Sequence, residues 1–128
     1  MKITIGKSAS VSVVVDGSNT ARAVGSGGLD VFATPMMIAL MERAACKCLE
    51  GCMGEGQTSV GTAVNVSHTA PSPVGAVIIA TATIENEYGR SIEFAVAASD
   101  GAGEIGGGRH TRVIVDGERL LGKAGMRK

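Results

Sequence analysis

The sequence predicts an α+β fold in a single domain that spans residues 1–128. Two observations lead to this prediction. Residues 34–50 carry apolar side chains at helical spacing, whereas the segments after Gly56 alternate between apolar and polar residues as strands do. A chain of 128 residues can also bury a substantial core without disulfides or metal ions. Aromatic residues make up only 2% of it, so that core must consist mainly of aliphatic residues and methionine.

The predicted helix begins at Thr34, a suitable N-cap, with Pro35 at the first helical position, and it ends at Gly51. Its length of about 15 residues corresponds to about four turns. At about 100° per residue, Glu42 falls on the apolar stripe of this helix, away from its charged face. A carboxylate in such a position is costly unless it is paired, hydrated or protonated. We therefore treat Glu42 as a candidate functional residue.

Five segments are expected to be extended, and they cover residues 9–16, 59–68, 74–87, 90–100 and 109–121. Strand periodicity places these residues of the second segment on one face: Val60, Thr62, Val64, Val66 and His68. Gly61 then lies on the opposite face. The glycine-rich residues 101–108 are expected to form a bend. Their GAGEIG fits a dinucleotide-binding pattern, but a strand pattern follows where that fingerprint requires a helix, so we predict a bulged hairpin.

One helix combined with these strands predicts a specific architecture. A single helix cannot cover both faces of an antiparallel sheet, so the economical solution is a curved sheet that wraps around the helix. One edge and the outer face then remain for a partner. This is the hotdog fold, a curved antiparallel β-sheet wrapped around one central α-helix, and such domains usually form dimers.

Composition limits the function classes. The 12 basic and 12 acidic residues balance to a net charge of zero and form no basic stripe, which argues against a nucleic-acid partner. The N-terminus lacks the apolar region of a signal peptide, and no stretch approaches the roughly 18 apolar residues of a membrane span. We therefore expect a cytoplasmic protein. The spacing of Cys46, Cys48 and Cys52 is not that of a zinc site, so we expect reduced thiols and neither a metal nor another cofactor.

Three residues form a candidate catalytic set: Thr34, Glu42 and His68. Each has an ordinary structural alternative on its own, namely a helix N-cap, a boundary carboxylate in an ion pair, and a satisfied core histidine. Together they are more informative, because a carboxylate, an imidazole and a hydroxyl are a usable set for the hydrolysis of an acyl group.

The stretches VFATPMMIALMERAA, GEGQTSVGTAVNVSHTAPSPVG and DGAGEIGGGRHTRVIVD resemble the fluoroacetyl-CoA thioesterase type of hotdog protein. The resemblance covers most of the chain from residue 31 to residue 116. It implies hydrolysis of a short acyl-CoA thioester in a homodimer, or in a tetramer of such chains, with the site at the dimer interface. The family's catalytic set falls on Thr34, Glu42 and His68, its glycine beside the acyl group on Gly61, and its arginine beside CoA on Arg112.

These residue types fit the chemistry that the resemblance implies. Glu42 can attack the thioester carbonyl directly or activate a water molecule, and the sequence leaves both routes open. His68 can hold and transfer the proton, because imidazole titrates near neutral pH. Thr34 can orient the carboxylate or the carbonyl. Gly61 can offer a backbone N–H or leave room for the acyl group.

The chain departs from the family pattern before the helix. The fluoroacetyl-specific member covers its pocket with a lid that contains phenylalanines, whereas residues 15–30, VDGSNTARAVGSGGLD, contain no aromatic residue. We therefore predict a thioesterase that acts on another short or medium acyl group.

The remaining features have ordinary interpretations. His110 and Arg112 share a strand face, where both face solvent or, alternatively, Arg112 binds the phosphate of CoA. Met36, Met37 and Met41 are expected to pack in the core. Two alternative functions stay open: an enoyl-thioester hydratase on the same fold, and a non-catalytic protein that binds acyl-CoA or another small ligand.

Overall fold

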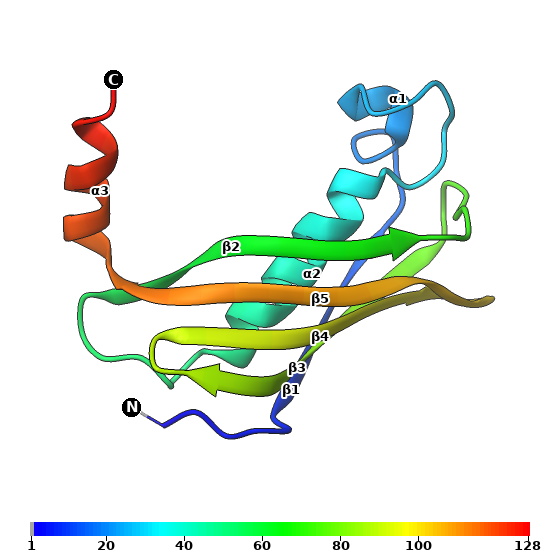
Figure 1. The fold of residues 1–128 in the computed structure, drawn as a ribbon. Helices are drawn as coiled ribbons and strands as arrows, with labels where there is room; N and C mark the ends of the chain where they lie inside the picture. Colours follow the sequence, from blue (N-terminus) through cyan, green and yellow to red (C-terminus); the bar gives the residue numbers. More distant parts are fainter. Residues whose placement is uncertain (1) are drawn as a thin grey trace.

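The computed structural model describes residues 2–128. Its elements, shown in Figure 1, are five strands and three helices. The strands are β1 (Ser8–Val14), β2 (Gln57–His68), β3 (Val77–Tyr88), β4 (Ser91–Asp100) and β5 (Gly103–Asp116). The helices are α1 (Ala21–Val24), α2 (Thr34–Cys48) and α3 (Gly117–Gly125).

The five strands form one antiparallel sheet in the order β1-β3-β4-β5-β2. Helix α2 lies across one face of this curved sheet, and α1 and α3 stand at its opposite ends (Figure 1). The predicted hotdog fold is therefore confirmed. Strands β1 and β2 are the two edges, and β2 is the longer of them, with 12 residues against seven.

The core lies between α2 and the inner face of the central strands. Alternate residues of β3 and β4 point inward and are fully buried, as their period-two apolar pattern predicts. Small alanines on β3 allow the helix to approach the sheet closely. Met37 and Met41 are buried in this core and Met36 packs against it, so the prediction for the three methionines is confirmed.

The start of α2 differs from the prediction. The N-cap is Ala33, whose side chain cannot accept a hydrogen bond, and Thr34 is the first helical residue. Pro35 still occupies the first turn, where its missing N–H is not needed. The expectation that Thr34 caps the helix is therefore wrong, and its hydroxyl is free to bond elsewhere.

The faces of β2 are also rearranged by a local irregularity. The register with β5 shifts between Gly61 and Ala63, so Thr62 forms a bulge. The extra residue reverses the side-chain parity, and Gly61 comes to the same, inner face as Val64 and His68. The prediction that Gly61 lies opposite His68 is therefore wrong, because strand periodicity fails across a bulge.

The end of the chain holds a third difference. The glycine-rich residues 103–108 belong to β5, which stops at Asp116 rather than continuing to residue 121. Asp116 caps helix α3 by accepting a hydrogen bond from the Arg119 N–H. No helix within residues 2–128 is long and apolar enough to cross a membrane.

Candidate active site

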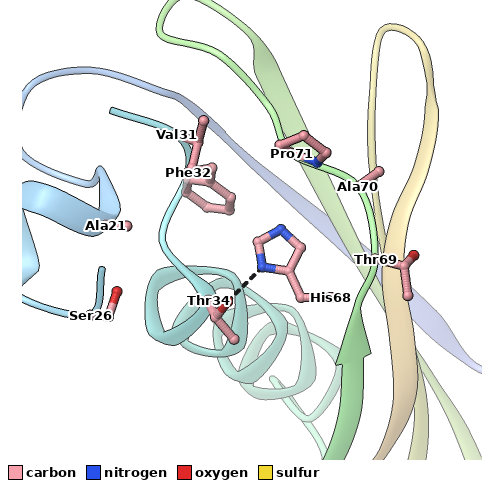
Figure 2. Close-up of a pocket in the computed structure, with 9 residues that line it drawn as sticks. All are labelled: Ala21, Ser26, Val31, Phe32, Thr34, His68, Thr69, Ala70 and Pro71. Carbon is pink, nitrogen blue, oxygen red and sulfur yellow. Dashed lines mark hydrogen bonds between the residues drawn. The ribbon is translucent and has the colours of Figure 1, made fainter. Parts of the chain in front are cut away.

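A cavity of about 280 Å³ opens beside the first turn of α2. Its walls come from α1 and the chain that follows it, from the start of α2, and from the end of β2 with the loop behind it. Figure 2 shows these residues, which are Ala21, Ser26, Val31, Phe32, Thr34, His68, Thr69, Ala70 and Pro71. The cavity brings together two members of the predicted catalytic set, Thr34 and His68.

The His68 ring uses only one of its nitrogens within the chain. Its Nδ1 lies 2.8 Å from the Thr34 hydroxyl, as the dashed line in Figure 2 marks. Its Nε2 is buried and has no hydrogen-bond partner among the described residues. A buried polar atom without a partner is costly, so water or a ligand is needed to satisfy it. The ring is thus held by Thr34 and lines the cavity, with its other nitrogen unpartnered.

Phe32 supplies an aromatic wall that the sequence analysis missed. The ring is 2% exposed and stands next to His68 in the cavity (Figure 2). Backbone hydrogen bonds fix its position, since the Phe32 N–H donates to Ser72 at 2.9 Å. Residues 15–30 contain no aromatic residue, but the sequence does place an aromatic ring, Phe32, two positions before Thr34.

Glu42 lies in a second cluster, further along α2. Its Oε2 accepts a hydrogen bond of 3.1 Å from Arg112 Nη1 and lies 3.8 Å from His110 Nε2. A Cβ on Gly61 would come within 2.5 Å of the same oxygen. Glycine at position 61 therefore leaves room for the carboxylate where it lies against β2. Because 39% of the Glu42 side chain is exposed, the carboxylate is held from one side and open on the other.

Arg112 is buried rather than directed to solvent. Its guanidinium donates to the Ser59 hydroxyl at 2.9 Å and to the Ser59 carbonyl at 3.0 Å, in addition to Glu42. Only 6% of the residue is exposed. The expectation that this strand face is open to solvent is therefore wrong. With its donors used inside the chain, Arg112 is placed to hold Glu42 rather than to reach a phosphate.

His110 completes this cluster as a neutral side chain. Its Nδ1 lies 2.8 Å from the Ala63 carbonyl, which can only accept, so that nitrogen carries the proton. Its Nε2 is then the acceptor for Arg112 Nη1 at 3.2 Å. Burial lowers the pKa of His110, and the charge of Arg112 lowers it further against the opposing effects of Ala63 and Glu42. The solvent-facing interpretation of His110 is wrong as well, since it is 1% exposed.

Comparison with known proteins assigns the chain to a family. Residues 15–118 match the family described as fluoroacetyl-CoA-specific thioesterase. The chain belongs to this family. It is 38% identical over 94 residues to the fluoroacetyl-CoA thioesterase of Streptantibioticus cattleyicolor, a match that covers 73% of this chain and 68% of that protein.

Solved structures of the family have the same fold as this chain. A structure of the fluoroacetyl-CoA thioesterase superposes with a TM-score of 0.94 at 30% identity and covers 100% of this chain and 99% of its own. A variant of that enzyme has been crystallised with fluoroacetate and CoA. A hot-dog-like protein from Thermanaerovibrio acidaminovorans superposes with a TM-score of 0.87 at 25% identity, covering 96% and 91% of the two chains. The predicted family and the predicted class of enzyme, a thioesterase, are confirmed.

Within one chain, the structure does not bring the whole predicted catalytic set together. Thr34 and His68 are in contact, but Glu42 follows Thr34 by two helical turns, or about 12 Å along the axis. The imidazole next to Glu42 belongs to His110 instead. The two clusters share the inner face of β2, one beside Gly61 and one at His68, the last residue of that strand.

The low pKa of His110 predicts a specific loss of stability in mild acid. The unfolded chain binds a proton at His110 near the ordinary pKa of 6.5, whereas the folded chain resists it until lower pH. The free energy of unfolding is therefore undiminished above pH 6.5 and falls as the pH drops below it. The variant His110→Asn keeps a donor for Ala63 but does not titrate. The fall in its free energy of unfolding between pH 6.5 and lower pH should therefore be smaller than in the wild type by the contribution of His110.

Urea unfolding of both proteins between about pH 5 and pH 7 measures the difference, because carboxylates titrate lower. The pKa of Asp100 is lowered by the hydrogen bond from Ser72, so its contribution to the free energy of unfolding is lost only below the ordinary pKa of 3.8. Parallel pH profiles of the wild type and His110→Asn would contradict the neutral, buried assignment.

Proposed function

We propose that this protein is a cytoplasmic homodimer that hydrolyses a short acyl-CoA thioester to the free acid and CoA. The observation that carries the proposal is the His68 ring, which lines the cavity, is held by Thr34 and has a second, buried nitrogen without a partner. In a chain that belongs to a thioesterase family, such a nitrogen is suited to hold a water molecule or the thioester. No cofactor is needed, since CoA arrives with the substrate.

The free edge of β2 supports a dimer. Its outer backbone groups have no partner strand, and exposed residues 61–65 leave this edge open. Antiparallel pairing of two β2 strands about their midpoint sets Gln57 of one chain opposite the partner subunit's His68. Glu42 contacts β2 at Gly61, which is near that midpoint. In the pair of strands, Glu42 then lies towards the second half of the partner's β2, which ends at the partner's His68. This arrangement brings Glu42 of one chain towards the partner subunit's His68.

The mechanism follows from these groups. The thioester carbonyl is attacked either by Glu42, which forms an anhydride that water then opens, or by a water molecule that Glu42 deprotonates. In both routes the C–S bond breaks and the CoA sulfur leaves with the electron pair and takes up a proton. That proton comes from the water molecule consumed in either route, and the partner subunit's His68, oriented by Thr34 of its own chain, transfers it to the sulfur. Arg112 and Gly61 fix the carboxylate in place.

The cavity supports a short acyl group of unspecified chemistry rather than fluoroacetate in particular. Its volume is about 280 Å³, and the segment that covers it, residues 15–30, contributes no aromatic side chain. Phe32 is the aromatic residue among those that line it. We therefore expect acetyl-CoA and its small homologues to be hydrolysed without strong preference for fluorine.

A panel of acyl-CoA thioesters of increasing chain length tests the function, with thiol release as the readout. Turnover that is fastest for short acyl groups and lost in His68→Ala supports the proposal. Tight binding of acyl-CoA without thiol release at any chain length would indicate a binding protein instead. Hydration of enoyl-CoA without thiol release would indicate a hydratase.

Mixing two inactive variants tests the shared site. Glu42→Gln and His68→Ala are each expected to be inactive as homodimers. If the site takes Glu42 from one chain and His68 from the other, each mixed dimer regenerates one intact site. A mixture at equal concentrations should then recover about a quarter of wild-type activity after subunit exchange, by the statistics of a two-fold dimer. A mixture that stays inactive although mixed dimers form would contradict the shared site.

A further inference from the structure

The burial of Arg112 leaves the phosphates of CoA without an obvious cation. One other part of the chain offers several. Arg90, Arg119 and Lys123 line a cavity of about 130 Å³ at the base of α3, together with Val115, Asp116 and Leu120. Arg90 comes from the turn between β3 and β4, whereas Arg119 and Lys123 lie one turn apart on α3. Residues distant in the sequence thus bring three positive charges to one hollow.

These cations have no anionic partner of their own. Within residues 2–128, none of the three takes part in an ion pair, although Arg22, Arg109 and Arg112 do. The acidic residue in the cavity wall is Asp116, and one of its oxygens already accepts the Arg119 N–H as the cap of α3. Three like charges around one hollow repel one another, so an anion bound there would relieve that repulsion.

The composition of α3 points the same way. After its cap the chain carries Arg119, Lys123, Arg127 and Lys128 against a single acidic residue, Glu118. No residue of α3 is buried, and the helix packs on its own chain only at its base. Figure 1 shows it standing clear of the sheet at the end opposite α1. The helix therefore lies outside the core and carries its basic residues on the surface, together with the exposed Leu121.

The position of this cluster relates it to the proposed active site. Asp116 pairs with Gln57, and the Gly117 N–H donates to the Gly56 carbonyl at 3.0 Å, so α3 begins at the first residue of β2. In the proposed dimer that end of β2 lies beside the partner subunit's His68. The base of α3 in one chain is then at the same end of the paired strands as the acyl cavity of the other.

We propose that Arg90, Arg119 and Lys123 bind the phosphate groups of the CoA nucleotide whose acyl group enters the cavity of the partner subunit. This inference rests on the proposed function. It assigns nucleotide recognition to α3 and the acyl chemistry to the α2–β2 face, so the two parts of the substrate are held by different chains. Arginine and lysine are the residue types suited to such an anion.

The test compares a substrate with and without the nucleotide. The triple variant Arg90→Gln, Arg119→Gln, Lys123→Gln is expected to raise KM for acetyl-CoA about tenfold or more, as the loss of three exposed charge contacts implies. Its kcat for acetyl-CoA and its KM for acetyl-pantetheine, which has no phosphate, should stay within about twofold of wild type. Lys2→Gln, an exposed charge elsewhere, is the matched control and should change neither KM.

A direct measurement of CoA binding tests the nucleotide site independently of the proposed thioesterase activity. Calorimetric titration with CoA itself requires no turnover, and the triple variant should bind CoA about tenfold more weakly than the wild type and the Lys2→Gln control. Unchanged CoA affinity in the triple variant would overturn the assignment, whether or not the wild type hydrolyses thioesters. An equal rise in KM for acetyl-CoA and acetyl-pantetheine would also overturn it, because the nucleotide would then play no part.

Discussion

Glu42→Gln is expected to lower the kcat of acyl-CoA hydrolysis by about a thousandfold or more and to leave the fold intact. The amide is neither a nucleophile nor a base, so both routes open to Glu42 are lost. Its carbonyl oxygen can still accept the hydrogen bond from Arg112 that the carboxylate accepts at 3.1 Å. It also adds no volume against Gly61. The effect should therefore fall on catalysis rather than on folding.

Thiol release under saturating substrate, together with thermal unfolding, separates the two effects. Arg43→Gln is the matched control, because Arg43 is the exposed neighbour of Glu42 on α2 and takes part in neither cluster. It should retain wild-type kcat. A Glu42→Gln enzyme with kcat within a few-fold of wild type would show that another group attacks the thioester.

Residue type was sufficient to find the candidate catalytic set but not its arrangement. Glu42 stood out because a carboxylate on an apolar helix stripe needs a partner, and the structure supplies that partner in Arg112. His68 and Thr34 were selected for their chemistry, and the structure places them 2.8 Å apart. What could not be foreseen is that Glu42 and His68 belong to different clusters of one chain. That separation depends on the length of helix between them and on an edge strand with no partner in the chain.

The misreading of His110 and Arg112 has a specific physical cause. Alternating polar residues on a strand normally face solvent, and the sequence contains no local signal against that interpretation. Their inward orientation follows the alternation of β5, which also buries Ile114, and Glu42, 70 positions from Arg112, pairs with its charge inside the fold. A buried polar face of this kind becomes recognisable only when its partners on another element are known.

The errors at the ends of elements share another cause. The bulge at Thr62, the cap at Ala33 and the helix after Asp116 each depend on one hydrogen bond or one inserted residue. Hydrophobic periodicity does not report such details, whereas it did identify α2 and the five strands correctly. The wrapping of the sheet around α2 followed from layer packing, since one helix can cover only one face.

Gly108→Ala should be among the most destabilising single substitutions in this chain, with an expected loss of at least about 3 kcal/mol in the free energy of unfolding. A Cβ on Gly108 would collide with the Asn65 carbonyl oxygen and lie 2.8 Å from the Val66 Cα. Both contacts are with backbone atoms of β2, which cannot rotate away as a side chain would. The two strands must separate at this point, and the hydrogen-bonded ladder between β2 and β5 is lost locally.

Thermal unfolding measures this effect, and at this chain length the melting temperature should fall by about 10 °C. Gly101→Ala is the control, because a Cβ there meets no atom within 4 Å, and its melting temperature should change by less than about 2 °C. The damage should reach the active site as well, since His68 pairs with Gly106 on the same ladder. Turnover in Gly108→Ala should therefore be reduced already at temperatures well below its unfolding transition. A variant that is as stable as Gly101→Ala would mean that β2 and β5 lie further apart than this structure has them.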